Sequence, residues 1–116
     1  MKLNSIVVVT LHSPREKIWG ELLDLNAAGV TLRGLDLNAF DVWLSQVGSE
    51  DQIGLATVFY PLYRVERVAL DEPVGNIPSL AATFYRKTGL TVLEYLNKIT
   101  PRFDLSSQFI KTKTVS

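Results

Sequence analysis

The sequence predicts a mainly-β protein with α additions, in which five strands form a small barrel. Residues typical of strands, both β-branched and aromatic, dominate five short runs between residues 5 and 70. A glycine stands in the middle of the second run, where a strand of a small barrel has to bend. Helical spacing of apolar residues is confined to one short segment and to the last third of the chain. With 116 residues, of which 47% are hydrophobic, the chain is long enough for one domain with a packed core.

The five strands are expected at residues 5–11, 17–25, 30–37, 54–60 and 63–70. The first contains an unbroken run of β-branched residues, which suits a pleated strand and restricts χ1 in a helix. Gly20 permits a bulge or a sharp bend in the second strand, and residues 26–29 supply a turn to the third. In the third strand we expect Val30, Leu32 and Leu35 to face the core.

A short helix is expected between the third and fourth strands, over residues 38–47. Its apolar residues are spaced i, i+3, i+4 and i+7, and they are Phe40, Trp43, Leu44 and Val47. Asn38 is a suitable N-cap residue for it.

Two further helices are expected after residue 78. Ser79 caps the first of them, which stops at Gly89. Thr91 and Glu94 form a capping box that starts the second. The tail that follows can be disordered or can dock as an extended arm. The chain is therefore divided into a small barrel at residues 1–78, a helical extension at 79–100 and a tail at 101–116.

The formal net charge of zero conceals a split along the chain. There are six basic and ten acidic side chains up to Pro78, and six basic and two acidic ones from Ser79 onward. A balanced chain lacks the uniform positive field of nonspecific nucleic-acid binding. The split can let the basic end of one chain lie against the acidic part of its own or a neighbouring chain. The alternative is that these side chains form an ordinary polar surface, on which salt screens the interactions between charges.

The sequence has no cysteine, which excludes thiol nucleophiles, disulfides and thiolate-bound metal clusters and favours a reducing compartment. Its first residues lack the pattern of a signal peptide, because the apolar run at residues 6–9 is short. No run approaches the roughly 18 to 20 apolar residues needed to cross a bilayer. We therefore expect a cytoplasmic protein with no membrane partner.

Several groups of residues carry a resemblance to a known family. They are Val7, Val9 and Leu11, then Gly20 and Leu22, then Asn26, Gly29, Val30 and Leu32, and finally the segments 58–60 and 64–68. In this order they resemble the apolar strand, glycine-centred bent strand, polar turn, third strand and last two strands of the Sm-like family. The resemblance covers residues 5–70 and implies an SH3-like five-stranded small barrel. It also implies a homo-oligomer in which open barrel edges pair between subunits, and a ring is one arrangement that such pairing allows.

The two connections that face RNA in Sm-like proteins depart from the family pattern here. The family places Asn or Asp in one connection and an Arg-Gly or Lys-His pair in the other. This chain has Ala-Ala-Gly at residues 27–29 and Pro61-Leu62 instead, and only Asn26 keeps a polar character. The resemblance therefore supports assembly through strand edges better than it supports RNA binding.

No group of residues in the sequence predicts catalysis, a metal or a cofactor. His12 is the only histidine, so one chain cannot form a two-histidine metal site, and no nucleophile elbow accompanies it. We expect His12 in an exposed turn, where a proton switch is the alternative role. The acidic pairs match no EF-hand spacing, and the glycines form no phosphate-binding loop. The sequence therefore predicts a noncatalytic protein.

Two functions remain open at this level. The first is a small-barrel protein that self-associates, with apolar strands and aromatic side chains at the contact between subunits. The second is an Sm-like RNA- or single-stranded nucleic-acid-binding module. Its charged and stacking side chains would be Arg15, Lys17, Trp19, Arg64 and Arg67. The alternative for aromatic residues such as Trp19 and Tyr60 is a place in the core or in a subunit interface.

Overall fold

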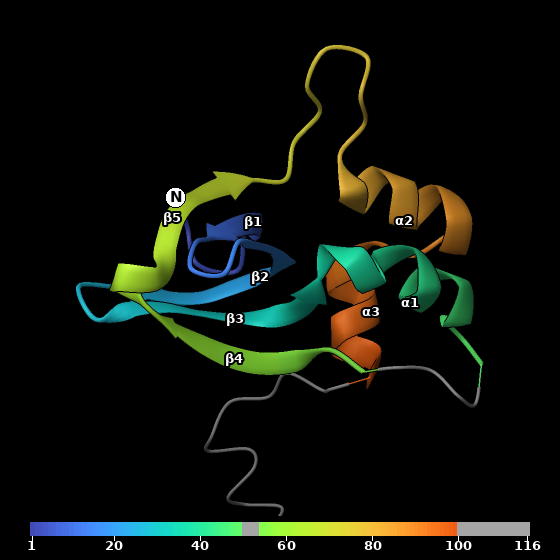
Figure 1. Ribbon diagram of the computed structural model, residues 1–116. Helices are drawn as coiled ribbons and strands as arrows, with labels where there is room; N and C mark the ends of the chain where they lie inside the picture. Colours follow the sequence, from blue (N-terminus) through green and yellow to red (C-terminus); the bar gives the residue numbers. More distant parts are fainter. Residues whose placement is uncertain (50–53, 100–116) are drawn as a thin grey trace, which may run out of the picture.

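The computed structural model describes residues 1–49 and 54–99, and it has a mainly-β fold with added helices (Figure 1). The strands are β1 (Ile6–Leu11), β2 (Glu16–Asn26), β3 (Gly29–Asp36), β4 (Ala56–Pro61) and β5 (Val65–Leu70). The helices are η1 (Leu37–Ala39), α1 (Phe40–Gln46), η2 (Leu62–Arg64), α2 (Leu80–Thr88) and α3 (Val92–Ile99). The predicted helix between the third and fourth strands and both predicted C-terminal helices are confirmed. The predicted tail, residues 101–116, lies outside the described residues.

The five strands form one antiparallel sheet in the order β4-β3-β2-β1-β5. Within the described residues no ladder joins β4 to β5, so the sheet is open and the predicted barrel is not closed. The two edge strands are joined only by the short helix η2, from which they diverge (Figure 1). Because β4 pairs with β3 and β5 pairs with β1, η2 connects two strands that lie at opposite edges of the sheet.

One face of the sheet encloses a hydrophobic cluster that draws on all five strands. Its members are Val7, Val9, Leu11, Ile18, Leu22, Val30 and Leu32, with Tyr60, Val65 and Val68 packed against them. Residues from β4 and β5 reach the same cluster because the sheet curls around it. We call this side the concave face.

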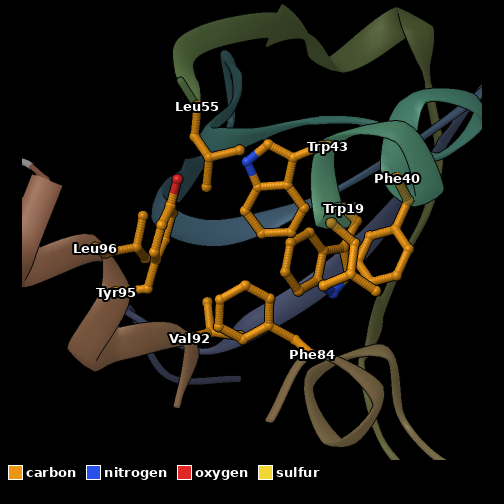
Figure 2. Packing of buried hydrophobic residues seen from close by; sticks show 9 residues of the cluster. Trp19, Phe40, Trp43, Leu55, Phe84, Val92, Tyr95 and Leu96 are labelled. Atoms are coloured by element: carbon orange, nitrogen blue, oxygen red, sulfur yellow. The ribbon is translucent and has the colours of Figure 1, made fainter. Parts of the chain in front are cut away.

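The opposite face is covered by the helices and carries a second, mainly aromatic cluster (Figure 2). Its buried members are Trp19, Phe40, Trp43, Leu44, Leu55, Phe84, Val92, Tyr95 and Leu96. Trp43 lies in the middle, stacked on Phe84 with ring centroids 5.2 Å apart and edge-on to Tyr95 at 5.5 Å. Both faces of the sheet are therefore apolar, which explains why residues 6–9 of strand β1 are an unbroken apolar run instead of an alternating one.

Leu35 faces a hydrophobic core as expected, but on the other side of the sheet from Val30 and Leu32. Val30 and Leu32 face the concave cluster, but Leu35 is paired with Trp19 and packs against the helix-covered cluster. Side chains alternate along a strand, so a residue three positions after Leu32 has to face the other way. A leucine is favourable there only because helices cover that face.

Two glycines face each other at a close approach of β2 and β3. Gly20 of β2 is paired directly with Gly34 of β3. A Cβ atom on Gly20 would lie 2.3 Å from the carbonyl oxygen of Arg33, and one on Gly34 would lie 2.0 Å from that of Trp19. No side chain fits between backbones this close, so the pair requires glycine on both strands.

The ends of the C-terminal helices follow their sequence signals. The Ser79 hydroxyl accepts a hydrogen bond from the Ala82 amide, and Gly89 takes a left-handed conformation with φ 78°. The amide of Thr91 donates to the Glu94 carboxylate while the Glu94 amide donates to the Thr91 hydroxyl, which confirms the capping box.

The predicted N-cap of the central helix is wrong. Asp36, and not Asn38, provides the cap, because its carboxylate accepts a hydrogen bond from the Asn38 amide at 2.7 Å. The chain first forms the short helix η1, and α1 begins only at Phe40. An aspartate at the end of β3 therefore starts the helical segment earlier than the apolar spacing indicates.

Asp71 joins three separate parts of the fold. Its Oδ2 accepts hydrogen bonds from the Trp19 indole at 3.0 Å and from the Ala81 amide at 2.8 Å. Its Oδ1 accepts one from the Leu80 amide at 2.8 Å. One carboxylate thus connects the end of β5, the buried tryptophan of β2 and the first turn of α2, where a negative charge is favourable.

Candidate functional site

Trp19, the aromatic member of the predicted nucleic-acid site, is fully buried, with 0% of its surface exposed. Its ring lies against Phe40 and Trp43, with centroids 5.1 and 5.5 Å away, and its indole nitrogen is bonded to Asp71. A base cannot stack on a ring that is enclosed on both sides. The alternative assignment of Trp19 to the core is confirmed.

Arg64 holds the turn between β1 and β2. Its Nε donates to the carbonyl oxygen of His12 at 2.9 Å, and its Nη2 donates to that of Pro14 at 3.1 Å. The same Nη2 lies 3.2 Å from Glu16 Oε1, and 21% of the Arg64 side chain is exposed. The guanidinium is thereby engaged by the turn and its neighbouring carboxylate.

The other three predicted basic residues are exposed. Lys17 and Arg67 are both in register with Thr10 of β1, one from each side, so they project from the same face of the sheet. Arg15 forms an exposed ion pair with Glu66 at 3.6 Å, a contact that contributes little to stability. Of the five predicted residues, Lys17 and Arg67 therefore lie on the same face of the sheet, and Arg15 is paired with Glu66. Trp19 and Arg64 instead stabilise the fold through their contacts with Asp71 and with the β1–β2 turn.

The polar residues of the two turns serve the local backbone. His12 is exposed, with its Nδ1 3.2 Å from the Ser13 hydroxyl. Asn26 accepts hydrogen bonds from the amides of Ala28 and Gly29, which shapes the turn between β2 and β3. Within residues 1–49 and 54–99, no three His, Cys, Asp or Glu side chains gather in a way that could hold a metal ion.

The sheet has two edges, and they differ in chemistry. In the described part of the chain, neither the outer side of β4 nor that of β5 is paired with a strand. The β4 segment, ATVFYP, carries no charged side chain, and Phe59 in its middle is 50% exposed. The β5 segment carries Glu66 and Arg67. Strand β4 is thus an edge without the charges that usually protect such edges from pairing.

A cleft of about 310 Å³ lies beside β4 on the concave face. Ile18, Leu32 and Val58 contribute its apolar lining, and Glu16, Asp36 and Tyr60 contribute its polar lining. Burial raises the pKa of the Tyr60 hydroxyl, and the negative charges of Glu16 and Asp36 raise it further, while Arg64 lowers it. The phenol therefore stays protonated, as a hydrogen-bond donor, throughout the neutral range.

The sequence analysis did not identify this cleft. Glu16 and Asp36 are twenty positions apart and become neighbours of the same hollow only through the register of β2 and β3, in which Ile18 faces Asp36. The available signal was the presence of small residues in three neighbouring strands, which becomes informative only when the register is known.

Fold and site together define a class: a mainly-β protein built on an open five-stranded antiparallel sheet with helices over one face. Comparisons with protein-family models, curated proteins and solved structures give no match for this chain. Among the described helices, none has the length and apolar character needed to span a membrane.

Proposed function

We propose that this chain is a noncatalytic protein of the SH3-like and Sm-like small-barrel type that self-associates through the edges of its sheet. The observation that carries the proposal is the uncharged edge strand β4 with its exposed Phe59. The strand order β4-β3-β2-β1-β5 and the short helix between the two edge strands support the fold type. An open edge of this kind presents unpaired amide and carbonyl groups that a second copy can satisfy.

The two edges suit pairing between different strands of two copies. Strands β4 and β5 each have six residues, and they lie at opposite ends of the sheet. Pairing β4 of one copy with β5 of the next would leave a β4 and a β5 free at the ends of the assembly. Such a head-to-tail contact adds further copies until a ring closes, and we propose a closed homo-oligomer on this basis.

Replacing Phe59 with lysine is expected to weaken self-association by about tenfold, because it removes a half-exposed aromatic contact and places a charge on the edge. Val42→Lys is the matched control, since Val42 is 55% exposed but lies on α1, away from both edges. Size-exclusion chromatography with light scattering over a range of protein concentrations measures both variants. A wild-type protein that stays a 13.0 kDa monomer at high concentration contradicts the proposal.

The second candidate function is binding of RNA or single-stranded DNA, and the pairing of Lys17 and Arg67 around Thr10 favours it. Within residues 1–49 and 54–99 these two side chains form no ion pair, but two cations can neutralise only a few phosphates, and the stacking partner Trp19 is buried. In a titration with a short RNA, we therefore expect no binding tighter than about 100 µM at physiological salt. Micromolar binding that weakens at higher salt and in Lys17→Ala would instead establish the second function.

A further inference from the structure

The cleft beside β4 exists because three small residues lie in one row across three strands. Gly20 of β2 is paired with Gly34 of β3, and Gly34 is paired with Ala56 of β4. Two positions further along these strands, where side chains again point to the concave face, the residues are larger and include Leu32 and Val58. This row of two glycines and one alanine has very little side-chain volume, so it forms a hollow in the concave face, bordered by aliphatic groups.

Two carboxylates line the cleft at its other border, where Ile18 is paired with Asp36. Glu16 and Asp36 line it there, and each uses one oxygen in a contact of its own: Glu16 Oε1 with Arg64, and Asp36 Oδ1 with the Asn38 amide. Their second oxygens, Glu16 Oε2 and Asp36 Oδ2, have no hydrogen-bond partner among the described residues. Tyr60, which is paired with Val30 of β3, also lines the cleft, and the negative charges of Glu16 and Asp36 help to raise the pKa of its hydroxyl.

Among the described residues that line this cleft, none has a basic side chain. Arg64 is directed at the β1–β2 turn, where it bonds the carbonyl groups of His12 and Pro14. Arg15 and Lys17 line a separate hollow on the other side of Glu16 and Asp36. The cleft thus combines an aliphatic floor with negatively charged hydrogen-bond acceptors at one end.

We propose that this cleft binds an alkylammonium group, with the aliphatic chain along Leu32 and Val58 and the ammonium at Glu16, Asp36 and Tyr60. The volume of about 310 Å³ lies at the lower end of ligand-pocket sizes and accommodates a short chain. An ammonium carries three donors, which match two carboxylate oxygens and a hydroxyl oxygen. An anion is repelled by the two carboxylates, and a hard metal ion needs more oxygen ligands than this lining offers.

Two sources can present such a group: a lysine side chain of a protein partner and a free diamine. Both share the aliphatic stem and the charged end, so the cleft chemistry is the same for both. The proposal does not depend on self-association, because the cleft uses side chains of the concave face, whereas the proposed contact between copies uses the backbone edge of β4 and Phe59, which is not among the lining residues of the cleft.

The test is an NMR titration of the ¹⁵N-labelled full chain with n-butylammonium. We expect saturable shifts of the Gly34, Asp36 and Ala56 amides with a Kd of about 1 mM, the range open to a ligand of about five heavy atoms. The matched neutral probe is 1-butanol. Adding a tripeptide with a central lysine and, separately, 1,5-diaminopentane distinguishes the two sources by which of them binds more tightly.

Three variants separate the cleft from nonspecific effects. Asp36→Asn removes the charge but keeps an acceptor for the Asn38 amide, and it is expected to weaken butylammonium binding about fivefold. Ala56→Leu fills the hollow from an exposed edge position and is expected to abolish binding while the dispersed NMR spectrum of a folded protein remains. Asp41→Asn, on α1 and outside the cleft, is expected to bind like the wild type.

Three results overturn the proposal. The first is the absence of saturable shifts at these amides in the folded wild type at concentrations far above the expected Kd. The second is equal binding of butylammonium and 1-butanol, and the third is equal binding by wild type and Asp36→Asn, because in both cases the carboxylates would play no part.

Discussion

Gly34→Ala is expected to lower the free energy of unfolding by about 3 kcal/mol or more, the upper end of the range for overpacked interiors. The new Cβ atom would lie 2.0 Å from the Trp19 carbonyl oxygen and 2.7 Å from the Gly20 Cα atom. Both obstacles are backbone atoms of β2, a strand paired on both sides, so no side-chain rotation relieves the clash. Urea denaturation followed by circular dichroism measures the loss.

Gly20→Ala tests the same contact from the other strand, because its Cβ atom would lie 2.3 Å from the Arg33 carbonyl oxygen. Gly54→Ala is the control, since a Cβ atom at Gly54 meets no atom of the described residues within 4 Å. This variant is expected to stay within about 0.5 kcal/mol of the wild type. If Gly34→Ala denatures at the same urea concentration as Gly54→Ala, the two strands do not approach each other as described.

Asp71→Ala is expected to cost about 2 to 4 kcal/mol of stability, from lost hydrogen bonds to a charged acceptor at a helix N-terminus. The substitution removes the partner of the Trp19 indole and of the Leu80 and Ala81 amides. The indole cannot turn to water for a replacement, because Trp19 is fully buried. The shift in the midpoint of thermal or urea unfolding measures this loss of stability.

Two companion variants separate this effect from a simple change of charge. Glu72→Ala removes a carboxylate at the next position, which is exposed, and is expected to change stability by less than about 0.5 kcal/mol. Asp71→Asn keeps one oxygen acceptor, and its stability is expected to lie between that of Asp71→Ala and that of Glu72→Ala. An Asp71→Ala protein as stable as Glu72→Ala would show that this carboxylate does not join the sheet to α2.

Features that depend on neighbouring residues could be predicted from the sequence. Ser79, Gly89 and the pair of Thr91 and Glu94 mark the ends of α2 and α3 because a helix cap is completed within a few residues. The strand runs were equally readable, since β-branched residues favour a pleated backbone wherever it pairs. Asn38 was misread as the cap because Asp36, two positions earlier, starts the helical segment, so that Asn38 is already inside η1 and its own amide donates to Asp36.

Features that depend on register could not be predicted. The pairing of β2 with β3 shifts between Leu22 and Asp24, and such a bulge changes which face the following side chains occupy. Trp19 and Arg64 both suit a nucleic-acid surface by residue type. However, α2 and α3 supply Phe84 and Tyr95 to the aromatic cluster that encloses Trp19, and a turn fifty residues away engages Arg64. The cleft acids were missed for the same reason.

The unbroken apolar run of β1 also determines how the molecule comes apart. This strand is paired with β2 on one side and β5 on the other, and its alternate side chains enter both hydrophobic clusters. Neither cluster can open without exposing one face of β1, so sheet and helices are coupled into one cooperative unit. The amide protons of Val7, Val8 and Val9 should accordingly exchange with solvent only when the whole chain unfolds, long after those of α1 and the strand edges.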